Sequence, residues 1–342
     1  PIKYGSIKIT NKLIKEKIIH KDIKNVQGKN LIMYAIENNR AELFKLLEKK
    51  GFDINEKDNQ NNNVLMYAAE YTDNIQILRF LLDKGINIDE QNKKGETAIF
   101  KAIKGKKEKN LEFLLKNNAN INIRNNDNKT AFFLVLEDKE FFYRRIEYMN
   151  ILKLLLDYNI DVNVQDEDGN TILHTALRSL ETDVADIILE HGIDVNIQNY
   201  LIKFIVENEK IKRIKIPNQT PLMIAIEKNL DDLSQKIIQK GANLDIQDAD
   251  GNTALIYAIL NSNNKLAKII IEKGVDLNVQ NNEGKTALFY AVMQNNYEIV
   301  KFLLENGIDI NIKDTSGKKA LNLAKDKKIK SLLLGSNKKI KS

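Results

Sequence analysis

Cysteine is absent from the 342 residues of this chain, tryptophan is absent too, and only three prolines occur. The lack of cysteine excludes disulfides, thiolate metal ligands and cysteine nucleophiles. No apolar run approaches the roughly 20 residues that a membrane-spanning helix needs, so we expect a soluble protein. The chain opens on Pro1 instead of Met. Its compartment therefore stays open between the cytoplasm and export after removal of an upstream segment.

Positive charge is scarce in the middle of the chain and concentrated at its two ends. The formal net charge is +6, with seven Lys against two acidic residues in 1–24 and nine Lys against one in 317–342. Residues 25–316 are therefore net acidic. Two interpretations fit this distribution. Either the basic ends are solvated caps, or they attract an anionic surface such as acidic lipid, nucleic acid or an acidic protein.

Two short stretches with closely spaced carboxylates look like the start of a calcium-binding loop. They read DADGNT at Asp248–Thr253 and DEDGNT at Asp166–Thr171. An EF-hand loop with glycine at its sixth position needs oxygen ligands at its first and twelfth positions. Around the first stretch those positions hold Ile246 and Tyr257, neither of which offers a carboxylate. We therefore expect no metal site here, and the repetition of the stretch becomes the more informative feature.

The DADGNT stretch belongs to a repeat with a period of 33 residues. Its turn glycine recurs as Gly251, Gly284 and Gly317, and the segments after the first two read GNTALIYAI and GKTALFYAV. A second glycine motif follows 23 residues after the first, as at Gly274 in KGVDLN. Earlier copies of the first motif begin at residues 28, 61, 95, 128, 169 and 218. The pattern predicts eight repeats and a partial ninth.

The motifs G-x-T-A-L-x-x-A and L-L-x-x-G-x-D-x-N at this period resemble the ankyrin repeat, over residues 25 to about 335. The resemblance implies an all-α solenoid of helix-turn-helix units joined by β-hairpin-like loops and capped at both ends. Only His174 occupies the histidine position of the family motif, and Asn128 and Asn218 stand where the turn glycine is expected. Because asparagine tolerates positive φ, both are predicted to preserve the turn.

The physics of a single repeat favours the same architecture. Thr253 can N-cap a first helix that carries Leu255, Ala258 and Ile259 on one face. A second helix follows and ends at Gly274, a suitable residue for a positive φ. One such helix pair cannot bury its own apolar face, whereas neighbouring pairs that stack bury a continuous core. We therefore expect an elongated, curved stack of helix pairs.

The predicted organisation is a basic capping helix over residues 1–24, a single repeat domain over 25–335 and a basic tail over 336–342. The predicted repeats cover residues 25–57, 58–91, 92–124, 125–165, 166–198, 215–247, 248–280 and 281–313, with a partial capping repeat at 314–335. The N-terminal cap is predicted from the helical spacing of four apolar residues within 8–26. These residues are Leu13, Ile14, Ile18 and Ile19.

Two segments exceed the period of the repeat. Sixteen extra residues at 199–214 lie between repeats five and six, and eight around 141–148 lengthen the connection inside repeat four. One interpretation is structural: a packed satellite helix at 199–214 and longer helix ends at 141–148. The other is functional, because insertions in repeat proteins often lie on the binding face.

The sequence carries no pattern that indicates catalysis or cofactor binding. The histidines His20, His174 and His191 lack metal-ligand spacing, and no G-x-S-x-G, Walker A or G-x-G-x-x-G motif occurs. His174 is predicted to hydrogen-bond the turn. Four tyrosines at one repeat position are predicted to pack instead of stacking on bases: Tyr34, Tyr67, Tyr257 and Tyr290. We expect no enzyme, no metal and no cofactor.

By the same resemblance, the partners of ankyrin proteins lie in a concave groove lined by hairpin tips and inner helices. We expect a monomeric scaffold that binds another protein and no small-molecule substrate, and the acidic middle disfavours nucleic acid. Carried over position by position, the partner-binding residues come from repeats five, seven and eight. They are Glu167, Asp168, Asn170, Arg178 and Ser179, then Ala249, Asp250, Asn252, Leu260 and Asn261, then Asn282, Glu283, Lys285, Met293 and Gln294.

Leu260 and Met293 stand out among these residues because other repeats place charged side chains at the same position. Those side chains are Glu37, Glu70, Lys104, Glu137, Arg178 and Glu227. An apolar pair surrounded by polar groups is typical of an interface hot spot. The alternative is that both residues fold against their own neighbours. The alternative function is an electrostatic tether to an anionic surface through the Lys-rich ends.

Overall fold

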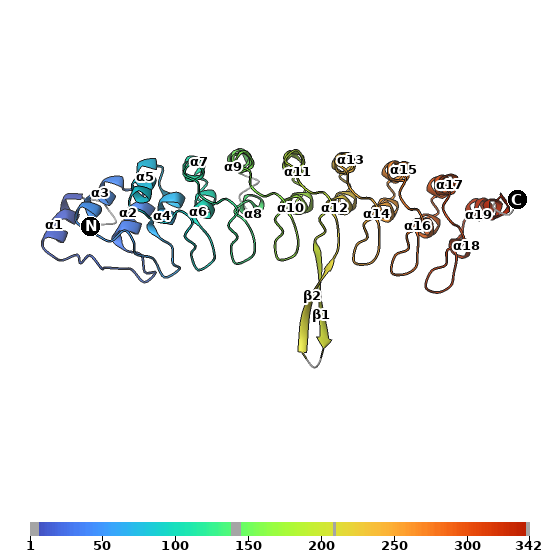
Figure 1. The fold of residues 1–342 in the computed structure, drawn as a ribbon, viewed down its shortest axis with the longest axis horizontal. Coiled ribbons are helices and arrows are strands. Elements are labelled where there is room, and N and C mark those ends of the chain that lie inside the picture. The colour runs from blue at the N-terminus through green and yellow to red at the C-terminus, as the bar shows by residue number, and fades with distance from the viewer. Residues whose placement is uncertain (1–6, 138–144, 208–209, 340–342) are drawn as a thin grey trace. The chain divides into compact units, whose positions relative to one another are not determined.

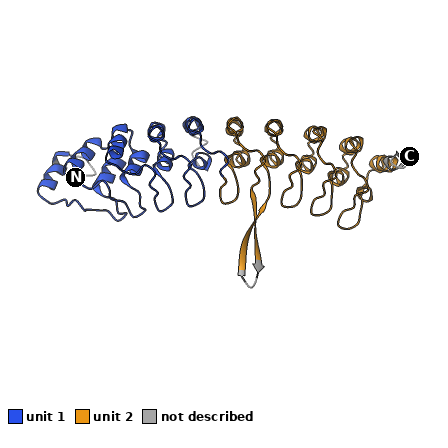
Figure 2. Cartoon of the chain, in the orientation of Figure 1, with its two compact units in different colours: residues 1–164 blue, residues 165–342 orange. Residues whose placement is uncertain are grey.

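The computed structural model describes residues 7–137, 145–207 and 210–339, and these contain 19 helices and one pair of strands (Figure 1). The chain divides into two compact units, residues 1–164 and residues 165–342, called here the N-terminal and C-terminal units (Figure 2). Within each unit consecutive short helices pack as pairs, and successive pairs stack on one another. This arrangement confirms the predicted helical repeat architecture.

The N-terminal unit begins with α1 (Ile7–Lys15) and continues with four helix pairs. These are α2 (Leu31–Glu37) with α3 (Ala41–Lys49), α4 (Val64–Tyr71) with α5 (Ile75–Asp83), α6 (Ala98–Lys104) with α7 (Glu108–Lys116), and α8 (Phe133–Glu137) with α9 (Arg145–Asp157). The first helices of successive pairs pack against each other, from α2 through α4 and α6 to α8. The inner row of helices therefore forms a continuous core within this unit.

The C-terminal unit holds five helix pairs and the two strands. The pairs are α10 (Ile172–Arg178) with α11 (Thr182–Leu189), α12 (Pro221–Glu227) with α13 (Asp231–Gln239), α14 (Ala254–Leu260) with α15 (Asn264–Glu272), α16 (Ala287–Met293) with α17 (Tyr297–Glu305), and α18 (Ala320–Leu323) with α19 (Lys327–Lys339). Here too the first helices pack in succession, from α10 to α18.

Repeat seven shows why the sequence folds in this way. Helix α14 begins after Thr253, which stands at the predicted N-cap position with an extended backbone at φ −93° and ψ 168° but makes no capping hydrogen bond through its side chain. Ala258 on α14 is 0% exposed, and its small side chain lets α12 and α16 approach α14 closely from either side. Helix α15 buries Leu266 and Ile270, and the left-handed φ of +78° at Gly274 then turns the chain away from the helix.

The extra residues between repeats five and six form a β-hairpin, so the interpretation of 199–214 as a satellite helix is wrong. Strand β1 (Tyr200–Glu207) pairs antiparallel with β2 (Lys210–Pro217), and Tyr200 lies opposite Pro217. Figure 1 shows the hairpin extending beyond the turns between the repeats, on the side away from α11 and α13. Each strand carries three β-branched residues, and β1 adds the aromatic residues Tyr200 and Phe204, which favours strands over a helix.

The other insertion lies partly outside the described residues. Residues 141–144 are not among them, and residues 145–148 form the first turn of α9.

The two asparagines that stand at turn-glycine positions differ from each other. Asn128 has a φ of 59°, as predicted. Asn218 has no positive φ, because the hairpin replaces the ordinary turn of repeat six.

The ends of the chain correct two expectations. The N-terminal helix stops at Lys15, and Ile18 is 61% exposed, so the helical spacing predicted through residue 26 does not continue. Lys17 has a φ of 56°, which is incompatible with a continued α-helix. At the other end α19 extends to Lys339, so most of the segment predicted as a tail is helical.

Candidate functional site

The DADGNT turn is held together by one buried carboxylate. Asp248 is 8% exposed, and its Oδ1 accepts hydrogen bonds from the backbone N–H groups of Asp250 at 2.9 Å and Asn252 at 2.7 Å. Its Oδ2 accepts a bond from the Tyr257 hydroxyl at 2.8 Å. Gly251 supplies the left-handed φ of +79° that the turn requires. The carboxylate of Asp248 is therefore part of the turn's framework, and that of Asp250 is left exposed at its tip.

Three of the four recurring tyrosines, Tyr67, Tyr257 and Tyr290, form a hydrogen bond with the first residue of the turn. The Tyr67 hydroxyl donates to Asp58 at 2.8 Å, as Tyr257 does to Asp248. Burial, and then the hydrogen bond to Asp248, raise the pKa of Tyr257 above its ordinary value. This environment supports the prediction that the tyrosines have a packing role.

His174 fixes the start of α10, as predicted for its position in the repeat. It is 0% exposed, its Nδ1 lies 2.8 Å from the Thr171 hydroxyl, and its Nε2 lies 3.3 Å from the carbonyl oxygen of Gln219 in the next repeat. Thr171 and His174 form a capping box. Burial lowers the pKa of His174 to about 3, so the imidazole is neutral at pH 7.

The predicted partner-binding residues of repeat five lie around its turn and at the end of α10. Glu167 and Asp168 are exposed at the tip, and Arg178 and Ser179 are exposed at the C-terminal end of α10. Asn170 is half-buried, and its side chain bonds to Asp166 and Asn199. Asn170 therefore joins neighbouring turns, whereas the other four present side chains to solvent.

Strand β2 changes the electrostatics of this turn in a way that the sequence analysis did not anticipate. Arg213 approaches Glu167 to 3.8 Å and Asp168 to 3.7 Å. All three side chains are about half exposed, so these ion pairs contribute little to stability. They nevertheless offset the negative charge at the tip of repeat five. A partner that reaches Glu167 and Asp168 therefore meets the base of the hairpin as well.

Several predicted residues at the tips of repeats seven and eight link the two turns. The Asn282 backbone N–H donates to the Asp250 carbonyl at 2.9 Å, and its side-chain amide donates to the Ala249 carbonyl at 3.0 Å. Lys285 pairs with Glu283 at 2.5 Å across the tip of repeat eight. The turn tips are thus fixed relative to each other and form a rigid rim.

Leu260 and Met293 are the last residues of α14 and α16, and both are exposed. Their exposed fractions are 45% and 49%, while the rest of each helix is largely buried. Gln294 donates a hydrogen bond to the Leu260 carbonyl at 3.0 Å, and Asn261 donates one to the Ile226 carbonyl at 2.6 Å. These bonds hold the ends of three successive inner helices together, so the two apolar side chains occupy fixed neighbouring positions.

Met293 also lines a pocket of about 430 Å³ at the end of the repeat stack. The other lining residues come from repeat eight and the partial ninth repeat, namely Lys285, Asp314, Ser316, Lys318, Leu323 and Lys325. The pocket joins two apolar side chains, Met293 and Leu323, to three lysines and one aspartate. It extends the predicted groove beyond repeat eight.

A second concave site, which the sequence analysis missed, lies in the N-terminal unit. A pocket of about 460 Å³ is lined by turn residues and inner-helix residues of the first three repeats, among them Lys29, Asp58, Tyr67, Tyr71 and Lys101. The rings of Tyr67 and Tyr71 stack at 6.0 Å. The pocket therefore offers aromatic faces and charged groups side by side.

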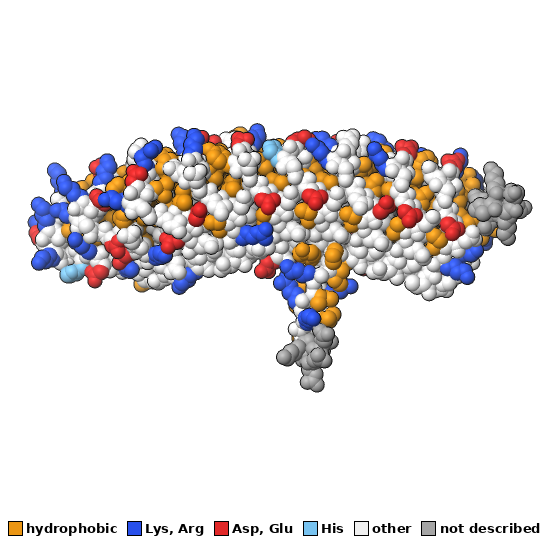
Figure 3. Space-filling model, in the orientation of Figure 1, with side chains coloured by type: hydrophobic (Ala, Val, Ile, Leu, Met, Phe, Trp, Pro, Cys, Tyr) orange, Lys and Arg blue, Asp and Glu red, His pale blue; other side chains and the backbone are white. Residues whose placement is uncertain are grey.

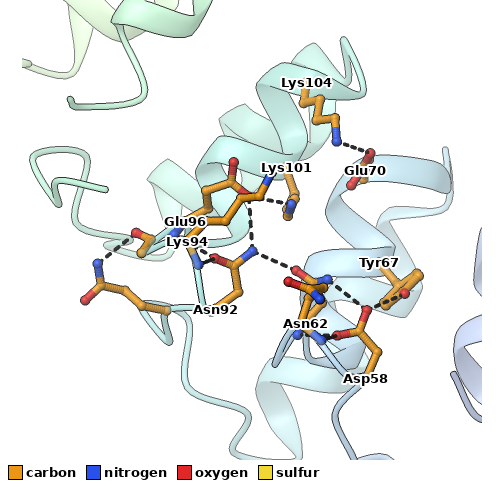
Figure 4. A network of polar contacts seen from close by, with 12 residues as sticks. Asp58, Asn62, Tyr67, Glu70, Asn92, Lys94, Glu96, Lys101 and Lys104 are labelled. Carbon is orange, nitrogen blue, oxygen red and sulfur yellow. Dashed lines mark hydrogen bonds and ion pairs between the residues drawn. The ribbon is translucent and has the colours of Figure 1, made fainter. Parts of the chain in front are cut away.

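A polar network crosses this pocket from one repeat to the next (Figure 4). Asn92 donates to Asn62 at 2.8 Å and to Glu96 at 3.0 Å, and Lys101 donates to Glu96 at 2.6 Å. Burial alone would raise the pKa of Glu96, but the hydrogen bonds from Lys101 and Asn92 outweigh it and lower that pKa. The network is stabilised by matched charges and shows no group set aside for acid–base chemistry.

The described residues offer no cluster suited to a metal and no membrane span. In residues 7–137, 145–207 and 210–339, no three His, Asp or Glu side chains converge in a way that could hold a metal ion. No helix in the same part of the chain has the length and apolar character needed to cross a bilayer.

Comparison with known proteins gives one family. A family model described as "Ankyrin repeats (3 copies)" matches residues 2–92, 65–142, 143–199, 198–281 and 222–314. An ankyrin repeat protein of Acanthamoeba polyphaga mimivirus is 26% identical over 197 residues, which are 56% of this chain and 25% of that protein. Ankyrin repeat and SAM domain-containing protein 6 of Rattus norvegicus is 27% identical over 97 residues, which are 28% of this chain and 11% of that protein. The matches thus span a quarter or less of either relative.

Proposed function

Because this chain belongs to the ankyrin repeat family, whose members are generally protein–protein interaction modules, we propose that it is a non-catalytic scaffold for a partner protein. The partner binds the groove lined by the turn tips and inner-helix ends of repeats five to eight. The family is typically non-enzymatic, and the proposal needs no cofactor.

The observation that carries this proposal is the exposure of Leu260 and Met293 in the middle of a polar rim. Two neighbouring apolar side chains, each nearly half exposed, can bury apolar surface only by binding something. Met293 shares a pocket with the turn residues Lys285 and Ser316, and Asp250 and Glu283 are exposed at the tips of repeats seven and eight. A small apolar centre enclosed by polar groups is the usual anatomy of a protein–protein hot spot.

The test is a double substitution, Leu260→Asp with Met293→Lys, in the full chain. Partners are captured from a lysate of the source organism on the immobilised wild-type chain and identified by mass spectrometry, and their affinity is then measured by calorimetry. We expect the double variant to weaken binding about tenfold or more. The matched control is Tyr297→Asp, because Tyr297 is 45% exposed but lies on the outer helix α17. Unchanged affinity in the double variant would place the binding surface elsewhere.

The alternative, an electrostatic tether, remains distinguishable in the same experiment. Helix α19 carries five lysines and no acidic residue between Lys327 and Lys339. A partner held by such a helix would be released when salt rises from about 50 to 200 mM and would be insensitive to the double variant. A partner held in the groove should show the opposite pattern.

A further inference from the structure

The β-hairpin of the C-terminal unit is an incomplete sheet. Among the residues that the structure describes, β1 and β2 pair only with each other. An isolated two-stranded hairpin is marginally stable in water, because each strand has a partner on one edge only. At the foot of β1 the Tyr200 N–H donates to the Asp168 carbonyl at 2.7 Å, and the rest of that edge extends beyond the turns. A third strand would satisfy one of those edges and would stabilise the hairpin.

Both faces of the hairpin combine apolar and basic side chains. Residues directly opposite each other share a face, so Phe204 lies with Arg213, and Ile205 lies with Lys212. Phe204 is 69% exposed and Ile211 is 76% exposed, although both are large apolar side chains. Figure 3 shows the basic and hydrophobic side chains intermixed along the projecting hairpin.

This pattern fits one class of partner better than the others. A ribbon that lies on a membrane needs one apolar face, and here each face carries cations. Phosphate-rich nucleic acid could neutralise these cations, but phosphates only accept hydrogen bonds and would leave the C=O groups of an open strand edge without donors. An extended peptide that carries both acidic and apolar side chains matches the mixed apolar and basic faces and the sign of the charge on the hairpin.

We infer that the hairpin formed by β1 and β2 binds an extended acidic segment of a partner protein, which adds to the hairpin as a third strand. Backbone hydrogen bonds to the open edge provide affinity. Carboxylates opposite Lys203, Lys212 and Arg213, and apolar side chains against Phe204 and Ile211, provide specificity. This surface is separate from Leu260 and Met293, so the inference does not depend on the groove.

The experiment uses the full chain and a fluorescent eight-residue peptide of alternating valine and glutamate, observed by fluorescence anisotropy. A peptide of alternating valine and lysine is its charge control. We expect the glutamate peptide to bind at least tenfold more tightly than the lysine peptide. Equal binding of the two peptides would overturn the inference.

A charge swap on one face of the hairpin then locates the peptide. In the variant Lys203→Glu with Lys212→Glu, the glutamate peptide should bind at least tenfold more weakly and the lysine peptide should bind more tightly. The matched control, Lys268→Glu with Lys301→Glu, makes the same charge change on the outer helices α15 and α17 and should leave the preference unchanged. An equal loss in both variants would show only a general charge effect and would refute a site on the hairpin.

Two further measurements separate strand addition from other modes of binding. A glutamate peptide methylated on every backbone nitrogen should lose at least tenfold in affinity, because neither edge of the added strand then has donors. Undiminished affinity would exclude strand addition. The groove variant Leu260→Asp with Met293→Lys should bind the glutamate peptide like the wild type. Lost binding there, or tighter hairpin-dependent binding to a DNA duplex or to phosphatidylserine vesicles, would overturn the inference.

Discussion

The buried imidazole of His174 makes the stability of the C-terminal unit sensitive to mild acid. The pKa of His174 falls from an ordinary value of 6.5 to about 3 because burial disfavours the charged ring. A histidine with a lowered pKa in the folded state takes up its proton more readily when unfolded. Its contribution to stability is therefore fully present above pH 6.5 and is lost as the pH falls from 6.5 towards 3.

The size of the loss in the free energy of unfolding follows from the difference between the pKa values of His174 in the unfolded and folded states. Each pH unit between the two pKa values costs about 1.4 kcal/mol, so lowering the pH from 7 to 5 should remove about 2 kcal/mol from the free energy of unfolding. The assay is urea denaturation monitored by circular dichroism at both pH values, on the wild type and on His174→Gln. Glutamine cannot ionise, so the stability gap between the two proteins should narrow by about 2 kcal/mol at pH 5.

Other titrating groups act in both proteins and cancel in this comparison. A gap that stays constant between pH 7 and pH 5 would show that His174 is not held neutral in the folded chain. A direct check is the NMR signal of the His174 ring proton, which should not shift between pH 8 and pH 5. A titration of this signal near pH 6.5 would refute the argument as well.

Two further predictions concern packing between repeats. Gly251→Ala should cost about 1–3 kcal/mol more than Gly274→Ala in urea denaturation. Both glycines have positive φ, but a Cβ on Gly251 would lie 2.8 Å from the backbone nitrogen of Asn282, and one on Gly274 would meet nothing within 4 Å. Equal losses would show that the turns do not approach so closely. Ala258→Leu should cost about 1–3 kcal/mol by overpacking, whereas the exposed Leu260→Ala should change the free energy of unfolding by about 0.5 kcal/mol or less. A tolerated Ala258→Leu would contradict the close approach of neighbouring inner helices.

The repeat architecture was predictable because each repeat carries the same types of residue at the same positions. A glycine with positive φ, an aspartate that bonds the turn and an alanine between inner helices recur at a fixed spacing, as at Gly251, Asp248 and Ala258. Nine approximate copies outweigh the ambiguity of any one. The period of the repeat also fixes where the predicted site residues lie. Leu260 and Met293 stand at a position that is charged in other repeats, and their exposure could be predicted for this reason.

The hairpin was not predicted because its segment occurs once and has no second copy to correct the interpretation. Its strongest signal is the mixture of basic residues and isoleucine from Lys210 to Ile216, which alternate except where Lys212 and Arg213 are adjacent and which favour a strand over a helix. The hydrophobic run before it, YLIKFIV, fits either structure. The position of Asn218 at the foot of the hairpin depends on the same insertion, so its φ could not follow the pattern of the other turns.

The N-terminal pocket could not be predicted from the sequence, for a different reason. Its network joins Asn62 of one repeat to Asn92, Glu96 and Lys101 of the next. The bond from Asn92 to Asn62 recurs between Asn281 and Asn252, but Glu96 and Lys101 stand at positions that vary from repeat to repeat. Only the stacking of two turns brings all four residues within hydrogen-bonding distance. Periodicity predicts which positions face the groove, but it does not predict which side chains there satisfy each other.

The way in which the hairpin is attached determines whether its sequence can be replaced without loss of the bonds between repeats. The residues at its foot are bonded to each other, because Asn218 N–H donates to the Asn199 carbonyl at 2.8 Å and Asn199 N–H donates to the Gln219 carbonyl at 3.0 Å. Gln198 still bridges to Asn218 and Gln247, as Gln247 bridges to Gly251 and Gln280. These hydrogen bonds connect repeats five and six directly at the foot of the hairpin. Tyr200 and Arg213 also contact the turn of repeat five, where the Tyr200 N–H donates to the Asp168 carbonyl at 2.7 Å. The bonds at the foot involve neither of these residues, so we expect the repeats to keep them when residues 201–216 are exchanged for another sequence.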